Sequence, residues 1–258
     1  MDYFIVSISA LFISGLTFFS GFGLGTLLMP VFALFFPLDI AIASTAVVHL
    51  CNNLFKFFLI KKQVRWDIVW RFGIPAVLSS LLGAWLLIHL SHMPEITSYV
   101  FSGKTYHIEW IKVIIGLLIM IFAALDIFPK MLPSHFGKKT LTLGGLLSGF
   151  FGGLSGHQGA FRSVILLKLH LPKEIFIATG ITLAFFIDAG RLSIYGPNYI
   201  PLITHGHHLH LIGTGIAAAM AGSILGNQVL KKITMTFIQA LVAVLLLMIS
   251  LLLILGVI

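Results

Sequence analysis

The stretch Ser20–Pro30, with the sequence SGFGLGTLLMP, gathers three glycines at the start of a short apolar segment at 24–36. A second stretch, Ser155–Leu166 with the sequence SGHQGAFRSVIL, repeats this arrangement at the start of a short segment at 159–171. Both segments are shorter than the ~20 residues that a helix needs to span a bilayer. Short, glycine-interrupted apolar segments at matching places in two halves of a chain indicate a transporter binding site.

The composition excludes a soluble protein. Of the 258 residues, 59% are hydrophobic and 9% are charged, and the mean hydropathy is +1.08. A soluble domain has roughly 25% charged residues, so this chain has too little polar surface for a water-facing globule. Its long apolar runs indicate that the solvent is lipid. The net charge of +8 is therefore read as membrane topology rather than as nucleic-acid binding, and the lone Cys51 excludes a disulfide framework.

The pattern predicts an all-α polytopic membrane protein with about eight transmembrane helices. The segments long enough to span lie at 3–20, 39–60, 68–90, 110–128, 140–155, 174–195, 208–230 and 235–258. The first of them follows Met1-Asp2-Tyr3, which has no basic residue. Because a cleavable signal peptide begins with a basic region, we expect this first segment to be retained.

An offset of 135 residues aligns the first half of the chain with the second. In this register the rare polar residues of one half align with polar residues of the other. The two short segments and the prolines that follow them also align. The polar pairs are Asp39 with Glu174, Ser44 with Thr179, Asn53 with Asp188, and Lys56 with Arg191. The chain is therefore predicted to contain two repeats, at 1–128 and 139–258, each opening with a glycine-broken or re-entrant helical hairpin.

The basic residues predict that the repeats are inverted. Eleven of the sixteen Lys and Arg residues lie in four connections, at 61–71, 129–139, 168–173 and 231–232. The loops at 91–109 and 196–207 contain one basic residue, Lys104. Since basic loops stay in the cytoplasm, each half crosses the membrane an odd number of times. Both termini are therefore expected outside.

Several of these residues also resemble a known family. The similar motifs are Gly21-Phe22-Gly23-Leu24-Gly25 with Pro30, Ala43-Ser44-Thr45, Gly156-His157-Gln158-Gly159-Ala160, and Ala178-Thr179. Over roughly residues 10–230 the chain resembles the sulfite exporter TauE/SafE family of membrane transporters. The resemblance implies a multi-pass carrier in the bacterial cytoplasmic (inner) membrane that moves sulfite, sulfonates or other sulfur-containing anions. We expect secondary transport by alternating access.

A dehydrated oxyanion needs N–H donors, hydroxyls and cations in place of water. Glycine loops and the helix N-termini that follow them supply backbone N–H groups and a positive dipole end. The candidate glycines are Gly21, Gly23, Gly25, Gly156 and Gly159. The alternative is that these glycines only allow close helix packing.

Three basic residues within the apolar segments are candidate anion ligands. Lys56 and Arg191 are repeat partners near opposite interfaces, and they either line the pathway or extend toward the headgroups. Arg162 follows the second glycine loop, where it faces either the anion or a lipid phosphate.

Uncharged polar side chains complete the candidate site. Ser44, Asn53, His157, Gln158 and Thr179 can donate hydrogen bonds to an anion, although hydroxyls in membrane helices often bond their own backbone. Asp188 lies three residues before Arg191, so the two share a helix face and can form an ion pair. The other possibility is that Asp188 and His49 couple transport to protons.

Two alternatives to anion transport stay open. A divalent metal-ion transporter would use the outward loop of His205, His207, His208 and His210, whose spacing can chelate a transition metal; otherwise these histidines belong to a polar loop. A membrane-embedded enzyme or assembly factor is the second alternative. The sequence contains no nucleophile–base pair, metal cage or P-loop, so neither enzymatic activity nor a cofactor is expected. The expected partners are the lipid bilayer and a small anion, with a homo-oligomer left open and no nucleic acid.

Overall fold

The computed structural model describes residues 1–18, 23–127, 138–203, 207–229 and 235–258. Within these ranges the chain forms ten α-helices, one 3-10 turn and one β-hairpin. The elements are α1 (Asp2–Thr17), α2 (Leu24–Ala33), α3 (Leu38–Ile60), η1 (Lys61–Gln63), α4 (Trp66–Ser91), β1 (Glu95–Phe101), β2 (Lys104–Glu109), α5 (Trp110–Ile127), α6 (Lys138–Ser155), α7 (Gly159–Lys168), α8 (Lys173–Ile203), α9 (His207–Val229) and α10 (Met235–Ile254). The predicted helical fold is confirmed, and each predicted apolar segment corresponds to one helix.

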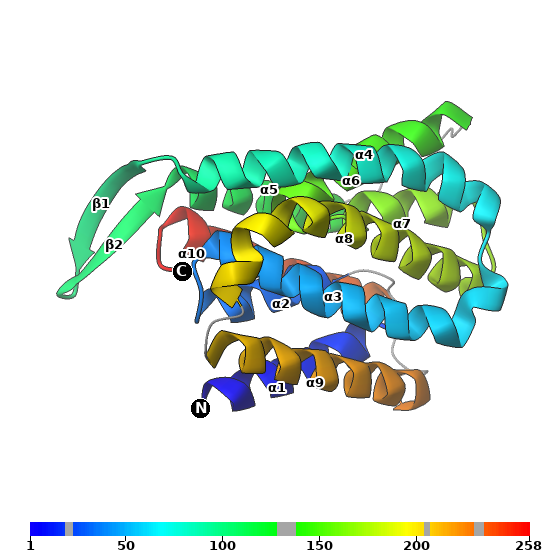
Figure 1. The fold of residues 1–258 in the computed structure, drawn as a ribbon, viewed down its shortest axis with the longest axis horizontal. Helices are drawn as coiled ribbons and strands as arrows, with labels where there is room; N and C mark the ends of the chain where they lie inside the picture. The colour runs from blue at the N-terminus through cyan, green and yellow to red at the C-terminus, as the bar shows by residue number, and fades with distance from the viewer. Residues whose placement is uncertain (19–22, 128–137, 204–206, 230–234) are drawn as a thin grey trace.

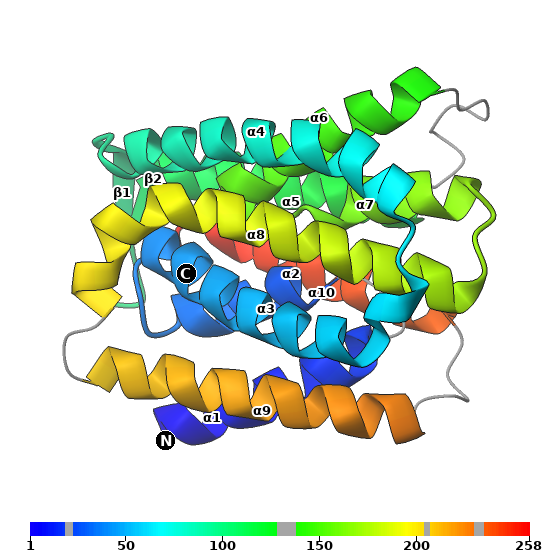
Figure 2. The same cartoon turned by 45° about the vertical axis from the view of Figure 1, so that its right-hand side comes forward.

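Helices α3 and α8 pack against each other in the middle of the bundle (Figures 1 and 2). Helix α4 packs on α6 and α8 along one side, and α9 packs on α1 and α3 along the other. Helices α5 and α10 form a third pair, and the short helix α2 contacts α3 and α10. In the described part of the chain, α3 and α8 therefore form the middle of the bundle.

The helix contacts of the first half recur in the second half. The pair α1–α9 corresponds to α6–α4, α3–α9 to α8–α4, and α2–α10 to α7–α5, while α3–α8 and α5–α10 correspond to themselves. Glycines allow close approaches in two corresponding pairs. Gly83 on α4 lies against the carbonyl of Phe150 on α6, and Gly226 on α9 lies against that of Gly15 on α1. Small residues allow membrane helices to approach this closely.

The two glycine elements introduce short helices, as predicted. Helices α2 and α7 each have 10 residues. Gly23 precedes α2 with φ +108°, and Gly156 lies just before α7 with φ +81°. This left-handed region is open to glycine at little cost, and it lets the chain reverse direction inside the bundle.

The segment at 91–109 is not a plain loop, in contrast to the expectation from sequence. Strands β1 and β2 form an antiparallel hairpin that projects from one end of the bundle (Figure 1). The turn residues Ser102 and Gly103 have φ +51° and +77°, the backbone of a tight hairpin turn. β-Branched and aromatic residues such as Ile96, Val100 and Phe101 favour the strands.

Helix α8 is longer than the predicted segment at 174–195. It continues to Ile203 through Pro197 and Pro201, and its last turns bend away from the main axis (Figure 2). A proline removes one backbone donor and kinks a helix without always ending it. The sequence predicted a span at 174–195 followed by a loop at 196–207, and that boundary was wrong.

The two ends of the bundle differ in charge. Both termini lie at the end that carries the hairpin, and the connections with Lys61, Lys62, Lys168 and Lys173 lie at the other end (Figure 1). In the part of the chain that the structure describes, four helices are long and apolar enough to cross a membrane. These segments are Leu38–Phe58, Trp66–Ser91, Lys173–Leu202 and His208–Gly226. Shorter apolar helices lie beside them.

The close contact at Gly83 predicts a large cost for a single methyl group. A Cβ at this position would meet the Phe150 carbonyl and the backbone nitrogen of Leu154. We expect Gly83→Ala to destabilise the detergent-solubilised protein by about 1–3 kcal/mol, the usual cost of overpacking, and to lower its melting temperature.

Gly213 on α9 provides the matched control. A Cβ there meets nothing within 4 Å, so Gly213→Ala should be neutral or stabilising, because alanine favours a helix more than glycine does. Equal melting temperatures for the two variants would contradict the packing argument.

Candidate functional site

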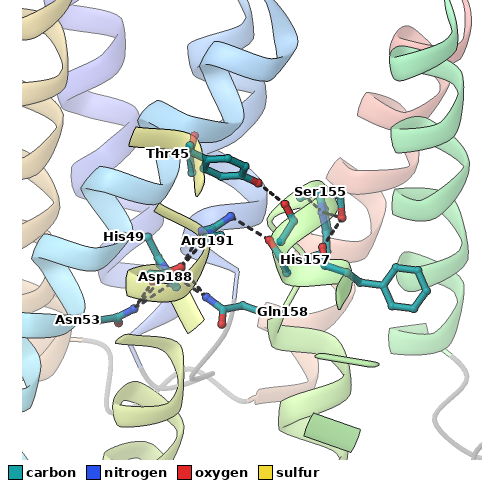
Figure 3. Close-up of polar contacts among 12 residues, drawn as sticks. Thr45, His49, Asn53, Ser155, His157, Gln158, Asp188 and Arg191 are labelled. Carbon is teal, nitrogen blue, oxygen red and sulfur yellow. Dashed lines mark hydrogen bonds and ion pairs between the residues drawn. The ribbon is translucent and has the colours of Figure 1, made fainter. Parts of the chain in front are cut away.

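A buried carboxylate, Asp188 on α8, forms the centre of a polar network (Figure 3). Its Oδ1 accepts hydrogen bonds from Arg191 Nε at 3.0 Å, Arg191 Nη2 at 2.7 Å and Gln158 Nε2 at 2.9 Å. Its Oδ2 lies 2.6 Å from His49 Nδ1 and accepts from Asn53 Nδ2 at 3.4 Å. One carboxylate thus joins α3, α8 and the connection between α6 and α7.

Helical spacing explains how these side chains meet. Asp188 and Arg191 are three residues apart on α8, and His49 and Asn53 are four apart on α3, so each pair shares a helix face. The packing of α3 on α8 then brings the two faces together. Gln158 comes from the turn after Gly156.

Arg191 is a buried partner of Asp188 rather than a residue that extends to the headgroups. Its side chain is 0% exposed, and Nη1 donates to the Gly152 carbonyl at 3.1 Å. The ion-pair interpretation of Asp188 and Arg191 is therefore the one that the structure supports.

The two glycine elements meet beside this network. The Cβ position of Gly25 lies 3.6 Å from the Gly156 carbonyl and 3.8 Å from the His49 ring. Gly23 and Gly159 lie at the N-termini of α2 and α7, and neither helix has a side-chain cap. The first N–H groups of a helix lack intrahelical partners, so these two ends can offer donors to an anion.

Two further cations are buried nearby. Lys56 on α3 is 4% exposed, and its Nζ lies 5.2 Å from the centre of the Phe18 ring. It lines a cavity of about 10 Å³ together with His49 and Asn53. Arg162 on α7 is 1% exposed and packs on α8, with its Nε 3.8 Å from the Cβ position of Gly180.

Lys56 also belongs to a chain of uncharged polar groups. In the amide orientation that gives every Asn52 atom a complementary neighbour, Oδ1 accepts from Lys56 Nζ at 3.1 Å and Nδ2 donates to Ser223 Oγ at 2.8 Å. Ser14 Oγ lies 2.7 Å from Ser223 Oγ. The hydrogen bonds among Asn52, Ser14 and Ser223, which are uncharged side chains, connect α3 to α1 and α9.

Three candidate residues lie outside the Asp188 network. Thr179 Oγ1 accepts from the backbone N–H of Arg65 at 3.1 Å, near the basic end of the bundle. Ser44 is buried, and its Oγ has no hydrogen-bond partner among the described residues. His157 Nδ1 lies 2.9 Å from the Ser155 carbonyl, its ring stacks on Phe122, and its Nε2 is buried without a partner in the described part of the chain.

Some predicted residues lie beyond what the structure describes. Gly21 and His205 are outside the described ranges, as is the side chain of His207. His208 packs its ring edge against Phe36 at 4.8 Å, and His210 is exposed. Across the described ranges, no group of three His, Cys, Asp or Glu side chains could hold a metal ion.

Sequence reasoning missed two tyrosines on the same face of α8. Tyr195 donates to the Gly153 carbonyl beside the second glycine loop, and Tyr199 Oη lies 3.4 Å from Ser91 Oγ. The two rings pack edge to face at 6.0 Å. Tyr195 and Tyr199 lie four and eight residues after Arg191. Because residues four apart share a helix face, this spacing could have indicated that both tyrosines lie on the same face as Arg191.

The Asp188–Arg191 pair predicts a strong coupling. Asp188→Asn leaves a buried guanidinium without its counter-charge, so it should destabilise the protein by about 3–5 kcal/mol, measured as the loss of melting temperature in detergent. Adding Arg191→Gln to Asp188→Asn should recover part of that loss. A double variant no more stable than Asp188→Asn alone would show that the pair does not carry the stability.

No curated protein and no solved structure matches the chain. The family profile described as sulfite exporter TauE/SafE matches residues 3–253. This match spans both glycine elements, the central pair α3–α8 and all ten helices. The chain therefore belongs to the sulfite exporter TauE/SafE family of membrane transporters.

Proposed function

We propose that the protein is a secondary transporter that carries a small anion, such as sulfite, a sulfonate or another sulfur-containing anion, across the cytoplasmic membrane. Family membership supports transport rather than catalysis. The observation that carries the proposal is the sign of the buried charge. Among the described residues, the buried charged side chains are three cations, Lys56, Arg162 and Arg191, and one carboxylate, Asp188.

An excess of buried positive charge favours an anionic cargo. Each charge near the middle of a membrane costs ~3 kcal/mol on insertion scales, and the described buried side chains carry more positive than negative charge. A bound anion lowers this cost, whereas a metal cation raises it. A cation pathway needs the opposite balance of charges, so the balance found here argues against the metal alternative.

The glycine elements provide the second part of the proposed site. The N-terminus of α2 at Gly23 and Gly25 approaches the turn at Gly156 beside His49. Uncapped N–H groups and positive dipole ends suit an anion, and Arg162 follows within the first turns of α7. We infer that the anion passes between these two elements.

An inverted repeat with alternating access fits the helix contacts. The contacts α1–α9, α3–α9 and α2–α10 have the counterparts α6–α4, α8–α4 and α7–α5 when the two halves are exchanged. In the proposed mechanism, α3 and α8 hold the site while the half at 1–128 rocks against the half at 139–258. His49 and Asp188, 2.6 Å apart, are the proposed coupling pair, since a proton on His49 strengthens its contact with the carboxylate.

Transport by purified protein tests the proposal. In proteoliposomes we expect flux of labelled sulfite or taurine, and we expect Arg162→Ala to abolish it because the buried guanidinium is lost from α7. Circular dichroism and gel filtration should show an unchanged fold. Lys168→Ala, on the last turn of the same helix, is the control and should retain flux.

Two outcomes would count against the anion proposal. Full flux in Arg162→Ala would remove Arg162 from the pathway. Movement of zinc or nickel without any anion flux, abolished by the combined changes His207→Ala and His208→Ala, would replace the anion by a metal ion.

The proposed topology is tested by labelling introduced cysteines in intact cells. With Cys51 changed to Ser, a cysteine replacing Ser98 on the hairpin should react with an impermeant maleimide from outside. A cysteine replacing Lys62 at the basic end should react only after permeabilisation. Labelling of both positions from the same side would contradict the assigned orientation.

A further inference from the structure

The two central helices carry the same pair of positions with different chemistry. Asn53 and Lys56 on α3 lie 135 residues before Asp188 and Arg191 on α8. In the second half, the residue three before the cation is a carboxylate that holds the guanidinium at 2.7 Å. In the first half it is an amide, which cannot neutralise an ammonium group.

Among the described side chains, Lys56 has polar contacts but no counter-charge. Its Nζ donates to Asn52 Oδ1 at 3.1 Å and lies over the Phe18 ring. No carboxylate among the described side chains lies within ion-pair distance of it. Asn53, one turn away, donates its own amide to Asp188. A cation this deeply buried without a carboxylate is costly, so a missing anion is the simplest complement.

We propose that the transported anion binds Lys56 on α3 in the way that the Asp188 carboxylate binds Arg191 on α8. The inference rests on the proposed function and names the cation that binds the anion. Lys56 contacts the transported anion, and Arg191 holds the hydrogen-bond network of Asp188 in place. The residue types agree with this division. The planar fork of Arg191 engages the Asp188 carboxylate through two nitrogens, whereas the ammonium of Lys, a compact point charge with three rotatable donors, can bind the three oxygens of a sulfonate or of the pyramidal sulfite ion.

The cavity beside Lys56 sets a condition for binding. Its volume of about 10 Å³ is close to that of a single water site, so it is too small for a sulfonate group. The cavity is also lined by Thr17 and Phe18 at the end of α1 and by Leu24 at the start of α2. This conformation therefore leaves too little room for the anion beside Lys56, and binding requires the cavity to widen.

An internal carboxylate placed on Lys56 should compete with the cargo. Asn52→Asp puts one at the atom that already accepts from Nζ at 3.1 Å and lies 3.3 Å from Ser14 Oγ, and the Ser223 hydroxyl, 2.8 Å from the other carboxylate position, can donate to the second oxygen. In purified protein we expect the thermal stability without anion to be equal or higher. The taurine or sulfite concentration that gives the half-maximal thermal shift should rise by about tenfold or more, and flux in proteoliposomes should fall with it.

Changes at Lys56 keep the test informative if Asn52→Asp does not fold. Lys56→Met should lose the anion-dependent shift, while Lys56→Arg, which keeps the charge, should retain a measurable one. Lys112→Met is the matched control, because Lys112 already has a carboxylate partner, Glu109, at 3.0 Å. Its response to anion should equal that of the wild type.

The possible failures are distinguishable. If the wild-type protein moves sulfite or taurine and the folded Asn52→Asp and Lys56→Met variants respond to them as the wild type does, the assignment of Lys56 is wrong and anion transport stands. If the wild-type protein shows neither flux nor a thermal shift with these anions, the proposed function itself fails.

Discussion

The carboxylate of Asp188 is the interaction on which the centre of this protein depends. Its two oxygens accept from, or contact, side chains of α3, α8 and the connection that follows Gly156. A buried carboxylate is tolerated only when its oxygens are paired. This requirement holds α3 on α8 and keeps the second glycine turn at their contact. Around this point the glycines of α4, α6 and α9 let the outer helices pack closely.

The same interaction separates the roles of the buried cations. Arg191 is engaged by Asp188 and by the Gly152 carbonyl, so its charge is already balanced. Among the described residues, Lys56, 135 positions earlier, contacts an amide and a ring and no carboxylate. In the described part of the chain, the guanidinium on α8 thus has an internal carboxylate as its partner, and the ammonium on α3 does not. This difference, in a member of a sulfite exporter family, is the physical basis for the proposed cargo site.

Much of the fold was predictable because its signals are local. Glycine clusters ending at Gly25 and beginning at Gly156 marked the two short helices, and uninterrupted apolar runs marked the long ones. The spacing of Asp188 and Arg191 indicated an ion pair before any tertiary contact was known. The hairpin at Glu95–Glu109 was missed because its strand and turn signals lie in a short segment between spans. The extension of α8 through Pro197 and Pro201 was missed because a proline can either end a helix or only kink it. The local sequence does not distinguish these two outcomes.

The sequence by itself determined the membrane setting, the short glycine-led helices, the pairing of positions 135 residues apart and the positive sign of the buried charge. The membrane setting and the short helices follow from composition and local patterns, and the pairing follows from comparing the two halves of the sequence directly. Only the tertiary structure decided which of these charges are balanced. His49, Gln158 and Asp188 are far apart along the chain. No local pattern predicts that His49 and Gln158 both contact the carboxylate of Asp188. Likewise, the contact of Lys56 with Asn52 rather than with an acid depends on how α1 and α9 pack against α3.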